Sequence, residues 1–89
     1  MKMKDLCADE RPREKMLDKG ASSLSNAELL AIMLRTGTGR YNVLEVAQTL
    51  LRRVDGRLDD LAAMSVEVLC ETTGIGPSKA VTLAAAFEL

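Results

Sequence analysis

The residues best suited to chemistry lie between positions 72 and 80, where the sequence reads TTGIGPSKA. Gly74 falls where one helix must end, and glycine tolerates the positive φ that such a turn favours. Pro77 follows Gly76 and suits the first position of a second helix, where a missing N–H costs nothing. That helix N-terminus would present unpaired amides and a positive dipole end, and Lys79 would add a charge. The run therefore predicts a phosphate site that reads no base.

The residues around this run have the spacing of two short helices joined by a tight turn. Ser65 can cap the first helix, Ile75 is expected to fill the space between the helices, and Ala80 is small where they approach. Together with Leu69 and Leu83, this spacing resembles the helix-hairpin-helix module. The alternative is a tight turn between two helices that only packs a small domain.

A second candidate loop spans residues 35–40, with the sequence RTGTGR. Its glycines, hydroxyls and flanking arginines suit a phosphate. It is not a Walker A loop, because no Gly-Lys-Ser/Thr follows at the required spacing. It is not a dinucleotide fingerprint either, because Asn42 stands where a third glycine would fall. The alternative is a solvated connector between helices.

Composition indicates one small helical domain and excludes several kinds of catalysis. The 89 residues are 47% apolar, and Tyr41 and Phe87 are the only aromatic residues, which favours helix over strand. With no histidine, the chain cannot supply Cys-His, Ser-His-Asp or His-bound zinc chemistry. Cys7 and Cys70 form no CxxC motif, which indicates a reduced, cytoplasmic protein. No apolar run approaches a membrane span, and the N-terminus lacks a signal peptide core.

Capping and stop signals divide the chain into an N-terminal arm and an all-α domain. We expect an extended arm over residues 1–11 and a tandem domain over residues 12–89. Ser25 with Glu28, and Asn42 with Glu45, fit the capping box. The expected elements are a peripheral helix over 12–19, further helices from Ser25 to about 34, from Asn42 to about 54, and over 58–63, 66–72 and 77–87, with hairpins near 36–42 and 73–77. Gly20 is expected to end the first helix, and Leu58, Leu61 and Ala62 are expected to point inward from the helix over 58–63.

The two halves of the domain show a weak internal repeat, which predicts two hairpin units joined by a connecting helix. One short helix pair cannot bury its apolar face alone, so two copies make physical sense. Chance similarity between short helical segments is the alternative. The matched positions are Leu24-Ser25 with Met64-Ser65, Leu29 with Leu69, residues 37–39 with 74–76, and Ala47 with Ala80.

Charge is unevenly distributed along the chain, although the net charge is only −1. Residues 35–57 hold five arginines against Glu45 and Asp55, whereas residues 58–89 hold Lys79 against five carboxylates. The second hairpin therefore lies in an acidic third, so DNA binding by that hairpin alone is expected to be weak and salt-dependent.

Three stretches together resemble the N-terminal domain of the bacterial RadC family: residues 9–15, residues 24–37 and the run GIGPSKA at 74–80. The resemblance covers about residues 3–89. Members of that family are named as DNA repair proteins, so the resemblance implies such a role. It also implies a C-terminal JAMM/MPN metalloprotease-like domain whose zinc ligands are two histidines and an aspartate. This chain lacks those ligands, so it is expected to be an N-terminal fragment without the metal domain. Where relatives often have a lysine, this chain has Arg40-Tyr41-Asn42.

The leading hypothesis is a non-catalytic module that binds DNA phosphates without sequence specificity. The rival is a protein-interaction module that docks on the metal domain or another partner, as the acidic C-terminal third and the Leu/Met content suggest. An enzyme in its own right is the third reading, which the missing histidine disfavours; the oligomeric state is left open. The expected contacts are Gly74, Ile75, Gly76, Ser78 and Lys79 in one patch, and Arg35, Gly37, Gly39 and Arg40 in the other.

Overall fold

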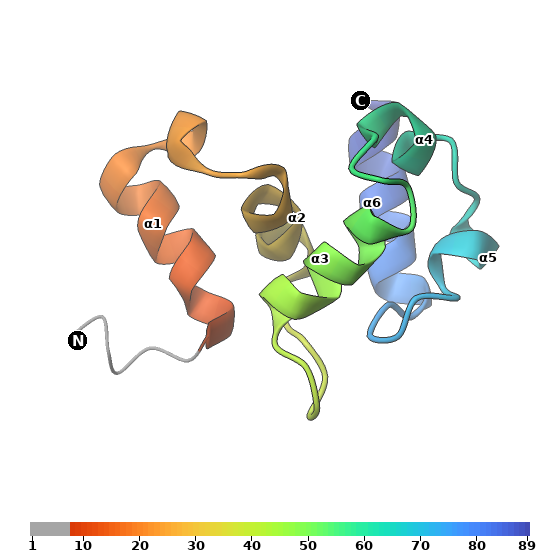
Figure 1. Cartoon of the computed structure of the whole chain (residues 1–89), viewed down its shortest axis with the longest axis horizontal. Coiled ribbons are helices and arrows are strands. Elements are labelled where there is room, and N and C mark those ends of the chain that lie inside the picture. The colour runs from red at the N-terminus through yellow and green to blue at the C-terminus, as the bar shows by residue number, and fades with distance from the viewer. Residues whose placement is uncertain (1–7) are drawn as a thin grey trace.

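The computed structural model describes residues 8–89, and this part of the chain is all-helical, as expected. It holds six α-helices, two 3-10 helices and no strand (Figure 1). The α-helices are α1 (Arg11–Lys19), α2 (Asn26–Leu34), α3 (Val43–Arg52), α4 (Leu58–Ala62), α5 (Val66–Leu69) and α6 (Pro77–Glu88), and the 3-10 helices are η2 (Ala8–Glu10) and η3 (Ala21–Ser23).

Side-chain caps fix where three of these helices begin. The hydroxyl of Ser25 accepts from the Glu28 amide and the Glu28 carboxylate accepts from the Ser25 amide, so the predicted capping box at α2 is confirmed. Asn42 and Glu45 form the same box at α3. Ser65 accepts from the amide of Val68 and caps α5. Each cap satisfies amides that have no partner within their helix.

The core is built almost entirely from aliphatic side chains of the last five helices. α2 packs against α3 and α6, and α5 packs against α6. Ile75 enters this core from a loop rather than from a helix, as predicted. The buried core residues are Leu30, Ala31, Leu34, Val43, Val46, Ala47, Leu50, Val54, Leu61, Leu69, Ile75, Ala80 and Leu83.

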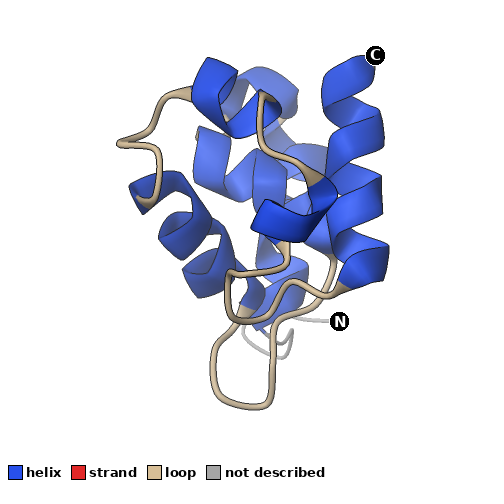
Figure 2. Ribbon diagram, turned by 90° about the vertical axis from the view of Figure 1, so that its right-hand side faces the viewer, coloured by secondary structure: helices blue, strands red, loops and turns tan. Residues whose placement is uncertain are grey.

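The elements form two helix–loop–helix units, α2–α3 and α5–α6, joined by α4, which is the expected order. The two connecting loops lie at the same end of the molecule in views 90° apart (Figures 1 and 2). Because the loops precede α3 and α6, the N-termini of both helices face this end. None of the helices in residues 8–89 is long and apolar enough to cross a membrane.

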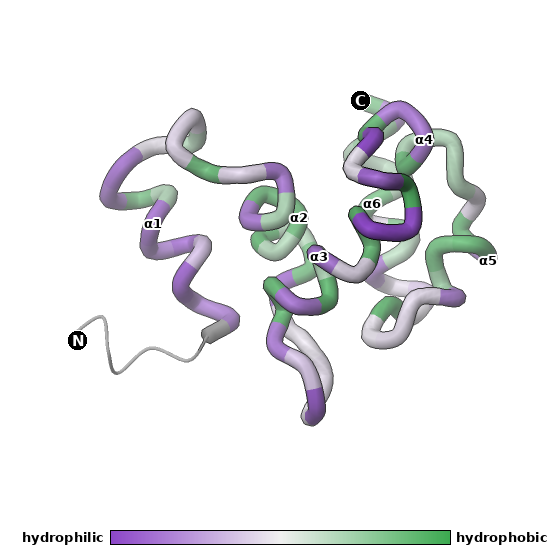
Figure 3. Tube along the Cα trace, in the orientation of Figure 1, coloured by the Kyte–Doolittle hydropathy of each residue, from purple (hydrophilic) through white to green (hydrophobic). Residues whose placement is uncertain are grey.

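Helix α1 lies on the side of α2 that is remote from α5, and its trace is mostly polar (Figures 1 and 3). Lys15 forms an ion pair with Glu28 at 3.1 Å, which links α1 to the start of α2. Gly20 ends the helix with φ +87°, as its position predicted. The expected extended arm is wrong for residues 8–11, because 8–10 form η2 and Arg11 begins α1; residues 1–7 lie outside the described part.

Two short helices differ from the sequence-based expectation. Only Leu61 of α4 is buried, whereas Leu58 and Ala62, expected to point inward, are exposed. A five-residue helix makes little more than one turn, so a single position faces the core. Helix α5 ends at Leu69 rather than near 72, because the amide of Thr72 bonds the Leu69 carbonyl at 3.2 Å and tightens the chain into a turn.

Candidate nucleic-acid interface

The predicted site residues lie on one surface, which we call the loop face. It consists of residues 35–42, residues 73–76 and the first turns of α3 and α6. The two loops pack closely there: a Cβ added to Gly74 would lie 3.1 Å from Thr38 Cγ2 in the first loop and 2.9 Å from Val46 Cγ2 in α3. The two predicted patches are therefore neighbours, although they are separated by more than thirty positions in the sequence.

Gly74 is required by the geometry of the second loop. Its φ is +94°, a region that favours glycine, so the predicted positive φ is confirmed. The next residue, Ile75, is 4% exposed and its amide donates to the Thr72 carbonyl at 3.0 Å. Both residues serve packing between the loops and helices, and Ile75 offers a ligand little surface.

The start of α6 is where an anion can come closest to the backbone. Gly76 precedes the helix in an extended conformation (φ −91°, ψ −177°), and Pro77 occupies the first turn, as predicted. No described side chain caps this helix. A Cβ built on Gly76 would have no described atom within 4 Å apart from those of the two neighbouring residues, so the space beside Gly76 is open. The amides of Ser78 and Lys79 fall in the first turn, where a helix supplies no acceptor. This geometry suits phosphate oxygens.

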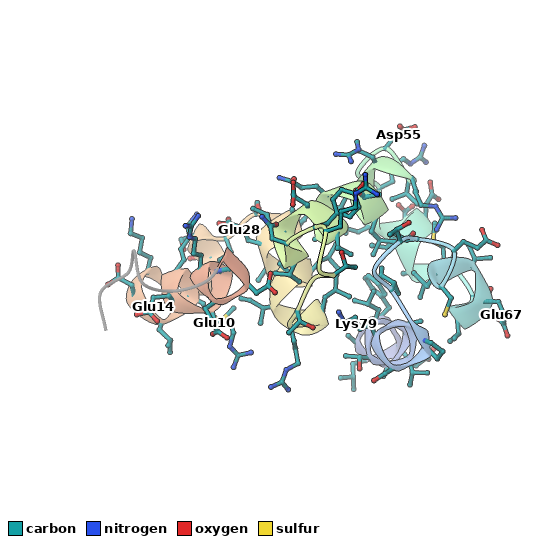
Figure 4. All side chains as sticks on the ribbon, turned by 90° about the horizontal axis from the view of Figure 1, so that it is seen from below. Glu10, Glu14, Glu28, Asp55, Glu67 and Lys79 are labelled. Atoms are coloured by element: carbon teal, nitrogen blue, oxygen red, sulfur yellow. The ribbon has the colours of Figure 1, made fainter. Side chains whose placement is uncertain are left out.

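Lys79 connects the start of α6 to the first loop. Its Nζ donates to the backbone carbonyl of Thr36 and lies 3.2 Å from the Thr36 hydroxyl oxygen. Figure 4 shows the side chain on the edge of α6 beside that loop. The ammonium group thus links the first turn of α6 to the start of the first loop.

A carboxylate from outside the first loop already occupies the amides at the start of α3. One carboxylate oxygen of Asp9 accepts from the Gly37 amide at 3.0 Å, and the other accepts from the Val43 amide, the first of α3, at 2.7 Å. Gly37 is also confined sterically, because a Cβ there would lie 2.1 Å from the Tyr41 carbonyl oxygen. Gly37 therefore closes the loop and holds Asp9.

Hydrogen bonds within the loop hold its tip. The hydroxyl of Thr38 accepts from the amides of Arg40 at 3.0 Å and Tyr41 at 2.9 Å, and the Thr38 amide donates to the Tyr41 carbonyl at 2.8 Å. The Arg40 guanidinium lies over the Tyr41 ring, 5.9 Å from its centroid. Gly39 is exposed at the same tip.

Arg35 begins this loop with an unusual backbone. Its φ is +72° and its ψ is −54°, and the Thr36 amide bonds the Leu34 carbonyl at 2.8 Å across it, which is a γ-turn. An arginine rather than a glycine thus occupies this strained position at the end of α2, and its side chain is exposed. The first loop thus presents Arg35 and Arg40 to solvent.

Comparison with known proteins identifies the family. The model for the UPF0758 N-terminal domain matches residues 3–81. The protein belongs to the UPF0758 family. A UPF0758 protein of Clostridioides difficile is 49% identical over all 89 residues, which are 38% of its length, and one of Bacillus licheniformis is 53% identical over 89 residues, 39% of its length. One of Dechloromonas aromatica is 48% identical, again over the whole chain and 39% of the relative. No solved structure matches.

This assignment agrees with the expected resemblance at the level of the family. The chain spans about two fifths of the length of the curated relatives it matches. The names of these UPF0758 proteins state neither a fold nor a ligand. Within residues 8–89 of this UPF0758 domain, no three Cys, Asp or Glu side chains are placed to hold a metal ion.

The structure adds residues to this UPF0758 site that the sequence did not indicate. The sequence predicts an extended arm for Asp9, and it indicates Thr36 only as one of the hydroxyls of the 35–40 loop. Arg52 and Thr73 belong to neither predicted patch, yet both line a pocket between the loops. The clustering of arginines between 35 and 57 was the one sequence signal that pointed to Arg52.

Proposed function

We propose that this domain is a non-catalytic module that binds DNA through backbone phosphates, without sequence specificity, and that its loop face is a tandem helix-hairpin-helix site. The observation that carries the proposal is the start of α6. Helices α2, α3 and α5 begin with a capping side chain, whereas α1, α4 and α6 do not. Of the uncapped helices, α6 begins with Gly76, which is open to solvent and is followed by Lys79 in the first turn. A phosphate would take the position that a capping oxygen takes elsewhere.

The start of α3 supports this reading by internal analogy. There the amides of Gly37 and Val43 hold two oxygens of the Asp9 carboxylate. The same kind of donor pair binds phosphate oxygens at helix N-termini. We therefore assign the phosphate contact to the amides of Gly76, Ser78 and Lys79.

Side chains of the first loop would complete the interface. Arg35 and Arg40 are exposed on the loop whose Thr36 accepts from Lys79, so we expect them to pair with neighbouring phosphates on the same strand. Three such cations predict a slope of about −3 for log Kobs against log salt concentration. The net charge of −1 gives the whole domain no general attraction to DNA, which keeps the expected affinity weak.

In longer family members, we propose that the module holds a downstream JAMM metalloprotease-like domain on DNA in the cytoplasm. The zinc implied by the resemblance would belong to that domain. This chain has no histidine and, over residues 8–89, no three-residue ligand group, so its residues do not fit that zinc site. We assign this domain a positioning role and no chemical step.

Fluorescence anisotropy with two labelled duplexes of unrelated sequence tests the proposal. Wild-type protein should bind both with similar Kd at low salt and lose affinity as salt rises. Gly76→Ala should weaken binding at least severalfold, while Lys19→Gln at the far end of α1 should not. No binding to either duplex at millimolar protein, or binding unaffected by salt and by Gly76→Ala, would overturn the proposal.

An exposed apolar feature supports a second candidate function, docking on another protein domain. Leu17 is 84% exposed beside a pocket that it lines with Arg13, Met16 and Ile32, between α1 and α2. Helix α1, marked by Glu14 in Figure 4, lies well apart from Lys79. The pair Lys79→Glu and Arg40→Glu should abolish DNA binding and leave such docking intact, whereas Leu17→Asp should do the reverse.

A further inference from the structure

A pocket of about 220 Å³ opens between the two loops, beside the proposed phosphate contact. Tyr41 lines it from the first loop and Thr73 from the second. Val46, Thr49 and Arg52 line it from α3, three residues apart along the helix, so they share one helix face. The volume is smaller than the roughly 300–1,000 Å³ of pockets for drug-sized ligands, and it suits a single planar ring.

The lining combines an aromatic ring with cations and hydroxyls. Tyr41 is one of only two aromatic residues in the chain, and its side chain is not used in the core, because it is 41% exposed. Arg40 lies over its ring, and Arg52 donates from Nη2 to the Thr49 hydroxyl at 3.0 Å. The three ion pairs found within residues 8–89 do not involve Arg52, which leaves its charge for a ligand. Aromatic rings beside arginines are typical of surfaces that bind single-stranded nucleic acid.

Hydrogen bonds fix the backbone of Tyr41 at this place. The Tyr41 amide donates to the Thr38 hydroxyl at 2.9 Å, and the Tyr41 carbonyl accepts from the Thr38 amide at 2.8 Å. Thr38 in turn packs beside Gly74 of the second loop. An exposed ring on a fixed backbone loses little conformational entropy when a base stacks on it. If the Tyr41 ring served packing alone, we would expect it to be buried, as Ile75 is.

We propose that this pocket receives the base of one unpaired nucleotide of single-stranded DNA, stacked on Tyr41, with the phosphate of that nucleotide near Arg52. The inference rests on the proposed function, because the strand reaches the pocket across the phosphate contact at α6. It makes the domain prefer DNA with an unpaired segment over intact duplex, in which the bases are stacked on one another. The preference would not depend on base identity, since every base has a π-face.

The sequence supplies its own probe, because Tyr41 is the only tyrosine and the chain has no tryptophan. Intrinsic fluorescence therefore reports on the pocket alone. Titration of the wild-type domain with oligothymidylate at low salt should quench this emission, whereas a blunt duplex of equal length should quench it much less. Absent quenching by the single strand, at concentrations where anisotropy shows it bound, would contradict the inference.

Variants then separate the pocket from the phosphate contact, using labelled DNA and anisotropy. Tyr41→Ala should weaken single-strand binding by about 5- to 100-fold, and Tyr41→Phe should restore it to within about threefold, since the ring is kept. Arg52→Gln should weaken single-strand binding more than duplex binding. If Tyr41→Ala leaves both affinities unchanged, the pocket proposal fails and the phosphate proposal stands. If wild type binds neither DNA, both fail. Circular dichroism melting confirms that each variant folds.

Discussion

The Nζ atom of Lys79 donates to the backbone carbonyl of Thr36, 43 positions earlier in the sequence. This contact joins the first turn of α6 to the loop between α2 and α3. It gives Lys79 two roles, because the same ammonium group that holds the loops together lies where a phosphate would bind. A substitution at this residue should therefore affect stability slightly and DNA binding strongly.

Lys79→Gln keeps a donor of similar length and removes the charge. We expect the free energy of unfolding to fall by less than about 1 kcal/mol, because the contact is exposed. The salt slope of DNA binding should become shallower by about 1, the share of one phosphate contact. Urea denaturation and anisotropy at several salt concentrations measure the two effects. An unchanged salt slope would remove Lys79 from the interface.

Gly74 and Gly76 are a matched pair that separates folding from binding. Gly74→Ala should cost about 1–3 kcal/mol, because φ is +94° and the new Cβ would meet Val46 Cγ2 at 2.9 Å. Gly76→Ala should cost less than about 1 kcal/mol, because its φ is −91° and its Cβ would find open space. Thermal melting tests both values.

The binding result for this pair has the opposite order. Gly76→Ala places a methyl group where the phosphate approaches and should weaken DNA binding in a folded protein. Gly74→Ala should leave binding intact below its lowered melting temperature. If Gly76→Ala binds DNA like wild type, the phosphate contact is not at the start of α6.

Asp9 should stabilise the fold through its two hydrogen bonds to the first loop. Asp9→Ala leaves the amides of Gly37 and Val43 without that partner and should cost about 1–3 kcal/mol. Glu10→Gln, at the exposed neighbouring position, should have little effect. Hydrogen exchange should quicken at the Gly37 and Val43 amides in the alanine variant alone. Unchanged exchange at both would show that Asp9 does not hold the loop.

Arg53 and Arg52 are adjacent but should respond differently to substitution. Nη1 of Arg53 donates to the Val68 carbonyl at 3.0 Å and to the Thr72 hydroxyl at 2.7 Å, which links α3 to the end of α5. Because Thr72 is buried, Arg53→Met should cost about 1–3 kcal/mol, and Arg53→Lys should cost less. Arg52→Met should change stability by less than about 0.5 kcal/mol. Equal losses in urea denaturation would contradict this assignment.

The capping box at α2 predicts a specific loss of stability in acid. The Ser25 amide donates to the Glu28 carboxylate at 2.8 Å and Lys15 lies 3.1 Å away, and these contacts lower the pKa of Glu28. Since the folded pKa lies below the unfolded one, the contribution is complete above the unfolded value of about 4.3 and is lost as pH falls through the folded value.

Glu28→Gln should therefore have a lower melting temperature than wild type at pH 7. The difference in melting temperature between the two proteins should be smaller at pH 3. Glu67→Gln is the control, because Glu67 occupies the first turn of α5 and takes part in none of the ion pairs found in residues 8–89. A difference between Glu28→Gln and wild type that is the same at both pH values would show that Glu28 does not titrate as described.

Local signals in the sequence predicted the elements of this fold well. The capping boxes at Ser25 and Asn42, and the positive φ of Gly74, depend on hydrogen bonds or sterics within a few residues, so spacing alone reveals them. The aliphatic core followed from the 3.6-residue periodicity of the longer helices. In α4 the same reasoning misplaced Leu58, because one turn of helix has too few apolar positions to define a face.

The contacts that define the candidate site are long-range, and no local pattern reveals them. Asp9 meets Gly37 and Val43 across 28 and 34 positions, and Lys79 meets Thr36 across 43. Each depends on how the two helix–loop–helix units pack. The sequence places glycines and cations in two loops. Only the fold shows that Asp9 occupies the N-terminus of α3, whereas the N-terminus of α6 faces solvent.

An NMR titration of the ¹⁵N-labelled domain with a short duplex tests the central claim most directly. At low salt, the amides of Gly76, Ser78 and Lys79 should shift together with those of Arg35, Gly39 and Arg40, and added salt should reverse the shifts. The amides of Gly37 and Val43, held by Asp9, should move less. If no amide of the loop face moves at millimolar duplex, or if shifts are confined to α1, the domain does not bind DNA through this surface.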